Sequence, residues 1–406
     1  YFNLAITWMI SEGMRAAVMN RYITNGLQAL DWMEDASRHG SSVSRELLMR
    51  LVRDNQDTEY GQKYHFREIQ SYADFAAKVP FSSYEDYEPY IEQMLCFNQK
   101  NLITADDVVY YAHTSGTTGT SKMIPCTKKS LDTFFSTGYE RIFGMYERSR
   151  REKGDEGMPT CKGMVIMESR IGYTPYSIAH GAISETVLHP EDIAHYNALP
   201  EELIYPKAEF DRRHVKMLFA LRERRLSFMM CSFAPFLYDM ITYLRQHWQV
   251  LCEDLALGRI CPDIAVDPAL RKKLDAHLTP DPERADEIRS IMSAHGEEAF
   301  VPLLWPDMKL VATIGSAAFA PYLEKLRQYL GPELEVDYLG YVSSEATIGA
   351  PIRENEGEYM LLPFSGFYEF IPMEDGAPET PLLMHQLEVG KEYELIVTNL
   401  SGFYRY

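Results

Sequence analysis

The feature that most constrains the fold of this chain is a strand-like segment that runs directly into a loop rich in glycine and hydroxyl groups. Residues 108–113 read VVYYAH, a β-branched and aromatic run typical of a buried strand, and residues 114–122 read TSGTTGTSK. Glycines let the backbone turn tightly and direct its N–H groups at an anion, and Lys122 adds a positive charge. The combination predicts a phosphate-binding loop at the end of a strand.

The glycine spacing of this loop does not follow the GxxxxGK[ST] pattern of a Walker A loop. The alternative interpretation is a flexible surface loop of Ser, Thr and Gly. The strand before the loop and the lysine at its end favour phosphate binding.

Strand-like and helix-like segments alternate along the rest of the chain. Strand patterns occur at 163–167, 226–230, 309–314, 335–339, 368–371 and 393–397, and helical patterns at 131–150 and 321–329. The alternation favours an α/β fold of layered sheets with flanking helices and a β-rich end. We expect residues 1–95 to form an N-terminal helical part of one large domain, and residues 96–406 its α/β core with a helical segment at about 208–300.

The charge of the chain limits the partners that it can bind. It carries 40 Lys and Arg against 59 Asp and Glu, a net charge of −19. Such an acidic surface repels phosphate backbones and anionic lipids, so we expect neither a nucleic-acid nor a membrane partner. No apolar run approaches the ~20 residues of a membrane span. The six cysteines are scattered without a CxxC pair, which indicates reduced thiols and a cytoplasmic location.

A second group of polar residues, Tyr341 to Glu345 (YVSSE), follows the predicted strand at 335–339. A carboxylate at the carboxyl end of a strand can hold Mg²⁺ or orient a phosphate. Taken alone, Glu345 is better interpreted as a solvated loop residue. The eleven histidines show no zinc-site spacing, and structural roles are expected for them.

The loop TSGTTGTSK, the segment YVSSE and the terminal YRY, in this order, resemble the adenylate-forming superfamily. Within it the chain is most similar to the Gretchen Hagen auxin-responsive family of acyl acid amido synthetases. Further matches run through most of the chain, among them NQDTEYG at 55–61, WQVLCEDLALG at 248–258, LWP at 304–306, IGS at 314–316 and EYELIV at 392–397.

The resemblance implies the large N-terminal domain of the adenylate-forming fold and a two-step reaction that uses ATP and Mg²⁺. A carboxylic acid is first adenylated, and an amine, expected to be an amino acid, then displaces AMP to form an amide. The small C-terminal domain of the family, with its catalytic lysine, is expected to be absent from this chain.

The resemblance also assigns roles to individual residues. Glu345 and Lys122 would be catalytic, with Glu345 beside the metal. The substrate residues Phe134 and Tyr139 come from the sequence itself, since an aromatic-lined pocket built from Phe134, Phe135 and Tyr139 would suit an apolar or aromatic acid. The nucleotide would be bound by Ser115, Gly116, Thr117, Thr118, Gly119, Ser121, Lys122, Ser316, Tyr341, Ser343, Ser344 and Arg405, with Phe367 and Tyr368 beside the adenine.

Two departures from the plant members limit what the resemblance implies. The plant arginine that contacts the acid has no counterpart at 131–134, and the plant pocket segment is replaced at 168–181 by ESRIGYTPYSIAHG. We therefore expect a non-plant member with a different acid. Two other functions stay open, an acid–thiol ligase that transfers the acyl group to coenzyme A and a nucleotide-binding protein without turnover.

Overall fold

A computed structural model of the chain describes residues 2–114, 121–157, 161–166, 171–186, 190–204, 208–315, 317–353, 358–374 and 380–406. A parallel sheet with the strand order β3-β6-β7-β8 lies at the centre of the largest hydrophobic core. Its strands are β3 (Lys162–Ile166), β6 (Leu226–Phe233), β7 (Leu310–Ile314) and β8 (Glu335–Tyr338). The four strands predicted here are confirmed, and so is the α/β fold class.

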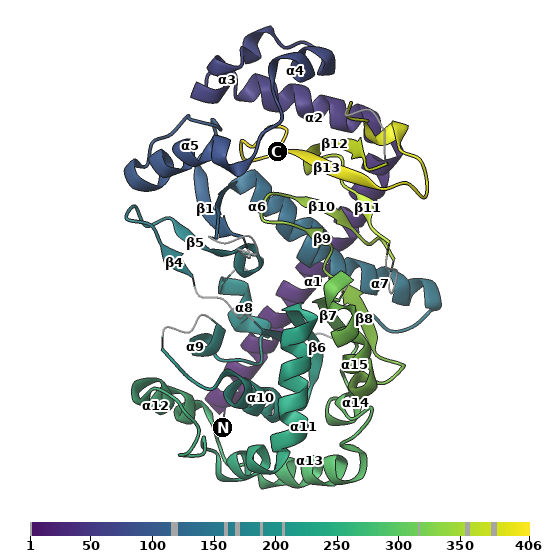
Figure 1. Ribbon diagram of the computed structural model, residues 1–406. Coiled ribbons are helices and arrows are strands. Elements are labelled where there is room, and N and C mark those ends of the chain that lie inside the picture. The colour runs from purple at the N-terminus through teal and green to yellow at the C-terminus, as the bar shows by residue number, and fades with distance from the viewer. Residues whose placement is uncertain are drawn as a thin grey trace.

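Helices cover this sheet, as the lower half of Figure 1 shows. They are α10 (Arg212–Arg222), α11 (Ala234–Leu257), α12 (Pro268–His277), α13 (Pro282–His295), α14 (Val301–Leu304) and α15 (Ala320–Leu330). Asp211 and Asp281 cap α10 and α13 by accepting hydrogen bonds from backbone N–H groups of the first turn. Gly258 ends α11 with a φ of 64°, a left-handed conformation that favours glycine.

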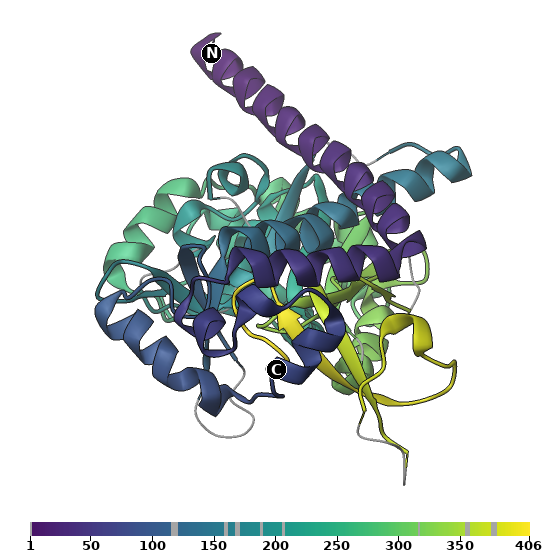
Figure 2. The ribbon, with the colours of Figure 1, turned by 90° about the horizontal axis from the view of Figure 1, so that it is seen from above.

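The long first helix, α1 (Phe2–Arg38), crosses α7 (Arg141–Lys153) at very close range, and its N-terminal end projects from the body in Figure 2. A Cβ added at Gly26 would lie 2.6 Å from the backbone nitrogen of Gly144, so this crossing requires glycine on both helices. No helix within the described ranges is long and apolar enough to cross a membrane.

The predicted helix at 131–150 is continuous but contains a π-helical turn. It consists of α6 (Lys128–Phe134), the turn η2 (Phe135–Glu140) and α7. The fully buried Arg141 follows this turn and donates to the carbonyl oxygens of Tyr338 (2.7 Å) and Pro351 (2.9 Å). The periodicity of the sequence did not indicate the π turn, which depends on these tertiary contacts.

A second sheet, with the order β2-β1-β5-β4, carries the start of the glycine-rich loop. Its strands are β1 (Val108–His113), β2 (Met123–Thr127), β4 (Gly172–Tyr173) and β5 (Ala179–Ala182). Strand β1 pairs antiparallel with β2 and parallel with β5. The predicted strand at 108–113 is confirmed.

The remaining elements belong to neither of these two sheets. The helical ones are α2 (Gly40–Asp54), α3 (Glu59–Lys63), η1 (Phe66–Glu68), α4 (Tyr72–Lys78), α5 (Tyr84–Phe97), η3 (Ile183–Thr186), α8 (Pro190–Tyr196), α9 (Glu201–Ile204), η4 (Ala317–Phe319) and η5 (Met384–Gln386). The strands are β9 (Tyr341–Val342), β10 (Thr347–Ala350), β11 (Met360–Leu361), β12 (Gly366–Pro372) and β13 (Tyr393–Asn399), of which β12 and β13 pair antiparallel beneath α2 in Figure 1.

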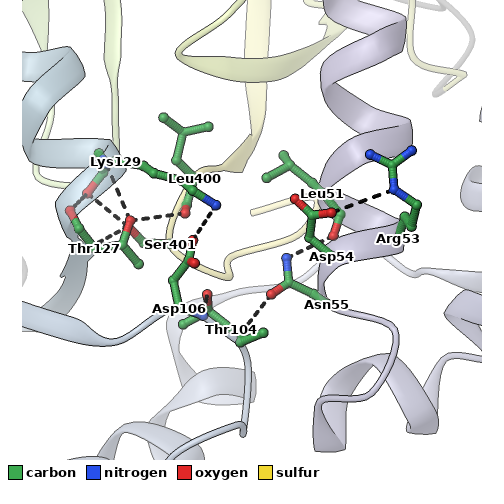
Figure 3. Close-up of polar contacts among 12 residues, drawn as sticks. Leu51, Arg53, Asp54, Asn55, Thr104, Asp106, Thr127, Lys129, Leu400 and Ser401 are labelled. Carbon is green, nitrogen blue, oxygen red and sulfur yellow. Dashed lines mark hydrogen bonds and ion pairs between the residues drawn. The ribbon is translucent and has the colours of Figure 1, made fainter.

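The C-terminal segment, residues 399–406, connects the helical N-terminal part to β2. Figure 3 shows Thr127, at the end of β2, bonded to Leu400 and Ser401, with Asn55 and Thr104 nearby. Beyond this, the Arg405 guanidinium binds both carboxylate oxygens of Glu369 at 3.0 and 2.9 Å and the carbonyl oxygen of Val79 at 2.7 Å.

We predict that Arg405→Met destabilises the protein by about 3–5 kcal/mol, because it leaves the carboxylate of Glu369, which is 1% exposed, buried without its charged partner and with only the Tyr72 hydroxyl donating to it. The matched control is Lys100→Met, which breaks the exposed pair with Asp107 and should cost less than about 1 kcal/mol. Urea unfolding followed by circular dichroism measures both. Equal losses in the two variants would contradict the structural role given to Arg405.

Candidate functional site

A cavity of about 950 Å³ opens where the carboxyl ends of the parallel strands meet the end of β1. Ile166 ends β3, Phe233 ends β6 and Ile314 ends β7, and each lines this cavity. In open α/β sheets, ligands bind outside the carboxyl ends of the strands. The cavity is therefore the candidate site.

Most of the cavity wall is apolar. Phe134 and Tyr139 come from α6 and the π turn, so the two residues predicted to contact the acid both line it. The other apolar lining residues include Val165, Ile166, Met230, Phe233, Phe236, Ile314, Phe319 and Leu339. Among the described lining residues Glu345 is the only Asp, Glu, Lys or Arg, so the apolar part of the cavity suits an uncharged, apolar group.

The polar end of the cavity is the turn at residues 343–345. The Ser343 hydroxyl accepts hydrogen bonds from the backbone N–H groups of Glu345 and Ala346, both at 3.3 Å, which fixes the turn. The Ser344 hydroxyl donates to the carbonyl oxygen of His113 at 3.1 Å. This contact joins the turn to the end of β1.

The base of the glycine-rich loop is closed by its own polar contacts. The backbone N–H of Thr114 donates to the carbonyl of Lys122 (3.1 Å), and the Thr114 hydroxyl accepts from the N–H of Lys122 (3.0 Å). Thr114 and Ser121 line the cavity. The predicted residues Ser115, Gly116, Thr117, Thr118 and Gly119 lie outside the described residues, as does Ser316.

Five other predicted residues are described but do not line the cavity. The ammonium of Lys122 lies 5.1 Å from the centre of the Tyr84 ring, and Tyr341 is half exposed. Arg405 is buried with its ion-pair partner. The last two, Phe367 and Tyr368, follow one another in β12 and enter different hydrophobic clusters, since successive strand residues point to opposite faces.

Three residues at the site were not identified from the sequence. The amide of Asn399, at the end of β13, donates to the carbonyl oxygen of Glu345 at 3.0 Å. The Tyr406 hydroxyl lies beside the Glu345 carboxylate, and burial together with this carboxylate raises the pKa of Tyr406. His113 lines the cavity and contacts His180. The YRY motif was a signal for Tyr406, whereas no local pattern indicated the other two.

The chemistry of Glu345 fits a magnesium ion. Mg²⁺ prefers oxygen ligands and is commonly held by one or two carboxylates together with substrate phosphates. Within the described ranges, no group of three or more His, Cys, Asp or Glu side chains could hold a metal ion by itself.

Two family profiles match this chain. The profile of the GH3 family N-terminal domain matches residues 29–335, and that of the GH3 family central domain matches residues 359–406.

Several known proteins are similar to it. A probable indole-3-acetic acid-amido synthetase, GH3.1 of Arabidopsis thaliana, is 28% identical over 401 residues, which cover 93% of this chain and 65% of that protein. A jasmonoyl–L-amino acid synthetase, GH3.5 of Oryza sativa subsp. japonica, is 25% identical over 409 residues, 93% of this chain and 68% of that protein. The structure of the GH3.15 acyl acid amido synthetase superposes with a TM-score of 0.77 at 23% identity, over 93% of this chain and 66% of that one. This chain thus spans about two thirds of the length of these proteins.

The imidazole of His113 is predicted to titrate below the ordinary histidine value of 6.5, because burial and, secondly, the neighbouring His180 lower its pKa. The unfolded chain then takes up this proton before the folded one. The contribution of His113 to the free energy of unfolding should be constant above pH 6.5 and fall as the pH drops through that value. NMR titration, with the resonance assigned by His113→Gln, measures the pKa. A midpoint at or above 6.5 would contradict the prediction.

Proposed function

Because this chain belongs to the GH3 family, we propose that it adenylates a carboxylic acid with ATP and transfers the acyl group to an amino acid to form an amide. The observation that carries the proposal is the cavity, in which an apolar compartment ends at Glu345 and the closed base of the glycine-rich loop. The relatives named above are amido synthetases by their names, which supports the same reaction class.

The proposed reaction has two steps. In the first, a carboxylate oxygen of the acid attacks the α-phosphorus of ATP and pyrophosphate leaves. In the second, the amine nitrogen attacks the acyl carbon and AMP leaves. A carboxylate is already ionised at neutral pH, so the first step needs no base.

The residues at the polar end of the cavity would position the reacting groups. The hydroxyls of Ser121 and Ser344, which donate to the carbonyls of Thr114 and His113, would turn to donate to phosphate oxygens. The loop residues from Ser115 to Gly119 would contact the same phosphates. Glu345 would hold Mg²⁺, which when bound neutralises charge on the phosphates. Positioning and charge neutralisation are the main contributions to phosphoryl chemistry of this kind.

The lining indicates the class of acid. An aromatic or other apolar acid would pack its tail between Phe134, Phe236 and Phe319, and no described lining residue offers a positive charge to a second carboxylate. This chemistry favours a monocarboxylic acid with an uncharged tail.

The amide-forming proposal is tested against its rivals by product analysis. The full-length protein is given ATP, pooled apolar acids, and either pooled amino acids or coenzyme A, and the products are identified by mass spectrometry. An amide with AMP release supports the proposal. A thioester would favour the acid–thiol ligase, and ATP binding without any product would favour the nucleotide-binding protein.

We predict that Glu345→Gln reduces acid-dependent ATP–pyrophosphate exchange by about 10²–10³-fold, the usual cost of losing one preorganised electrostatic contact. Glutamine keeps the size and hydrogen-bonding capacity of the side chain but removes the charge. Thermal unfolding should be nearly unchanged, which separates a chemical role from a structural one. Exchange at the wild-type rate would remove Glu345 from the reaction.

Phe134→Ala is predicted to raise KM for the acid about 10-fold or more, with KM for ATP unchanged, because it removes apolar contact in the cavity equivalent to about 1–3 kcal/mol. Phe97→Ala is the matched control, since Phe97 is 71% exposed at the end of α5 and lies outside the cavity. Pyrophosphate exchange at varied acid and ATP concentrations measures both constants. An equal rise in the two KM values would contradict a specific acid contact.

A further inference from the structure

Two histidines form a directly bonded pair in the wall of the cavity. Nε2 of His113 lies 2.9 Å from Nδ1 of His180, and the two rings stack with centroids 4.9 Å apart. His113 ends β1 and lines the cavity beside the turn at 343–345, whereas His180 lies in β5 and is not among the lining residues.

The fold provides a specific place for this pair. Strands β1 and β5 run parallel, with Tyr111 opposite His180 and His113 opposite Ala182, so both imidazoles stand on one face of the sheet. Gly172, opposite His180 in β4, leaves room for its ring, since a Cβ there would lie 2.4 Å from ring carbon Cε1. The pair is therefore built from three strands.

The hydrogen bond restricts the protonation of the pair. One of the two bonded nitrogens has to accept, so in this geometry the two rings cannot both be imidazolium ions. The bond leaves Nδ1 of His113 and Nε2 of His180 outside it. A proton taken up at Nδ1 of His113 can thus be followed by transfer of the Nε2 proton to His180.

Among the described contacts of His113, none places a carboxylate against its imidazole that could neutralise a positive charge on the ring. From β2, the opposite residue is the uncharged Met123, and the neighbouring ammonium of Lys122 is directed at the Tyr84 ring. From the turn after β9, Ser344 contacts the His113 carbonyl and Glu345 shares the cavity. Strand β5 contributes His180, and β4 contributes Gly172 and the largely exposed Tyr173.

We propose that His113 is the base that accepts the proton lost by the ammonium group of the amino acid in the second step, and that His180 passes a proton on. This assignment rests on the proposed amide-forming function. An amino acid reaches the site as an ammonium ion, which has to lose a proton before its nitrogen can attack the acyl carbon. The N–C bond forms as the bond between the acyl carbon and the AMP oxygen breaks, and AMP keeps the electron pair. The nitrogen loses two protons in all. The first moves from the ammonium group to Nδ1 of His113 before the attack, while the Nε2 proton of His113 moves to Nδ1 of His180 and the Nε2 proton of His180 goes to solvent. The second leaves the nitrogen as the N–C bond forms and goes to the phosphate of the departing AMP.

This role is consistent with the lowered pKa of His113, which keeps the imidazole neutral and able to accept a proton at pH 7. The pair has no part in the first step, because the acid is already ionised there. The two half-reactions should therefore respond differently to its removal.

The test uses His113→Gln and His180→Gln in the full-length protein, with His39→Gln, an exposed residue before α2, as the matched control. Acid-dependent pyrophosphate exchange reports the first step. Single-turnover transfer of the acyl group reports the second, once to an amino acid and once to hydroxylamine. Hydroxylamine is largely unprotonated at neutral pH, so its nitrogen needs no base before it attacks, and the proton released in the attack goes to the departing AMP.

For His113→Gln we expect transfer to the amino acid at pH 7 to fall about 10²-fold or more, the usual contribution of a general base. Exchange and hydroxamate formation should stay within about twofold of the wild type and of the control. Transfer to the amino acid should recover as the pH is raised, because more of the amine is then free. His180→Gln should show the same pattern with a smaller loss.

Three results would overturn the assignment. Equal losses in exchange, amide and hydroxamate would show a structural role, and an unchanged rate of amide formation would show no role. A wild-type protein that catalyses no acid-dependent exchange would remove the proposed function itself. That outcome is distinguishable because it appears before any histidine is changed.

Discussion

The buried ion pair between Arg405 and Glu369 is the interaction on which the organisation of the site depends. Arg405 also donates to the carbonyl of Val79, so it joins β12, the end of α4 and the C-terminal segment at one point. With both charges buried, the pair is stable only when every partner is in place. It therefore fixes the path of residues 399–406 through the N-terminal helices.

That fixed path is what positions the polar end of the cavity. Asn399, at the start of the segment, holds the backbone of Glu345, and Tyr406, at its end, lies beside the Glu345 side chain. Leu400 and Ser401 bind Thr127 at the end of β2, which leads back to the base of the glycine-rich loop. Segments that lie more than 200 residues apart in the sequence thus meet around one carboxylate.

The cavity combines an apolar environment and a polar one, which a single helix or strand could not easily provide. Its apolar wall comes from the carboxyl ends of a parallel sheet and from the π turn, whereas its polar groups come from β1, the loop base and the turn after β9. Arg141 joins the two parts, because it follows the π turn and donates to the carbonyl of Tyr338 at the end of β8 and to that of Pro351 just after β10. Under the proposed function, an apolar acid and a charged phosphate would be held next to each other without an apolar surface facing the charge.

Local structure was determined by the sequence itself. The β-branched run at 108–113 and the buried runs of the parallel sheet form strands because their side chains suit a covered sheet, and Ser71 caps α4 by accepting from the N–H of Asp74. The family motifs indicated Glu345 and Ser344, and the aromatic residues of the predicted helix at 131–150 indicated Phe134 and Tyr139; all four line the cavity. Only the tertiary structure decided which distant residues meet. His113 and His180 are 67 residues apart and come together through the parallel pairing of β1 and β5, and Arg405 is directed into an ion pair away from the cavity. Strand pairing and burial are set by contacts between segments, and no local pattern of residues specifies the partner that a segment will find.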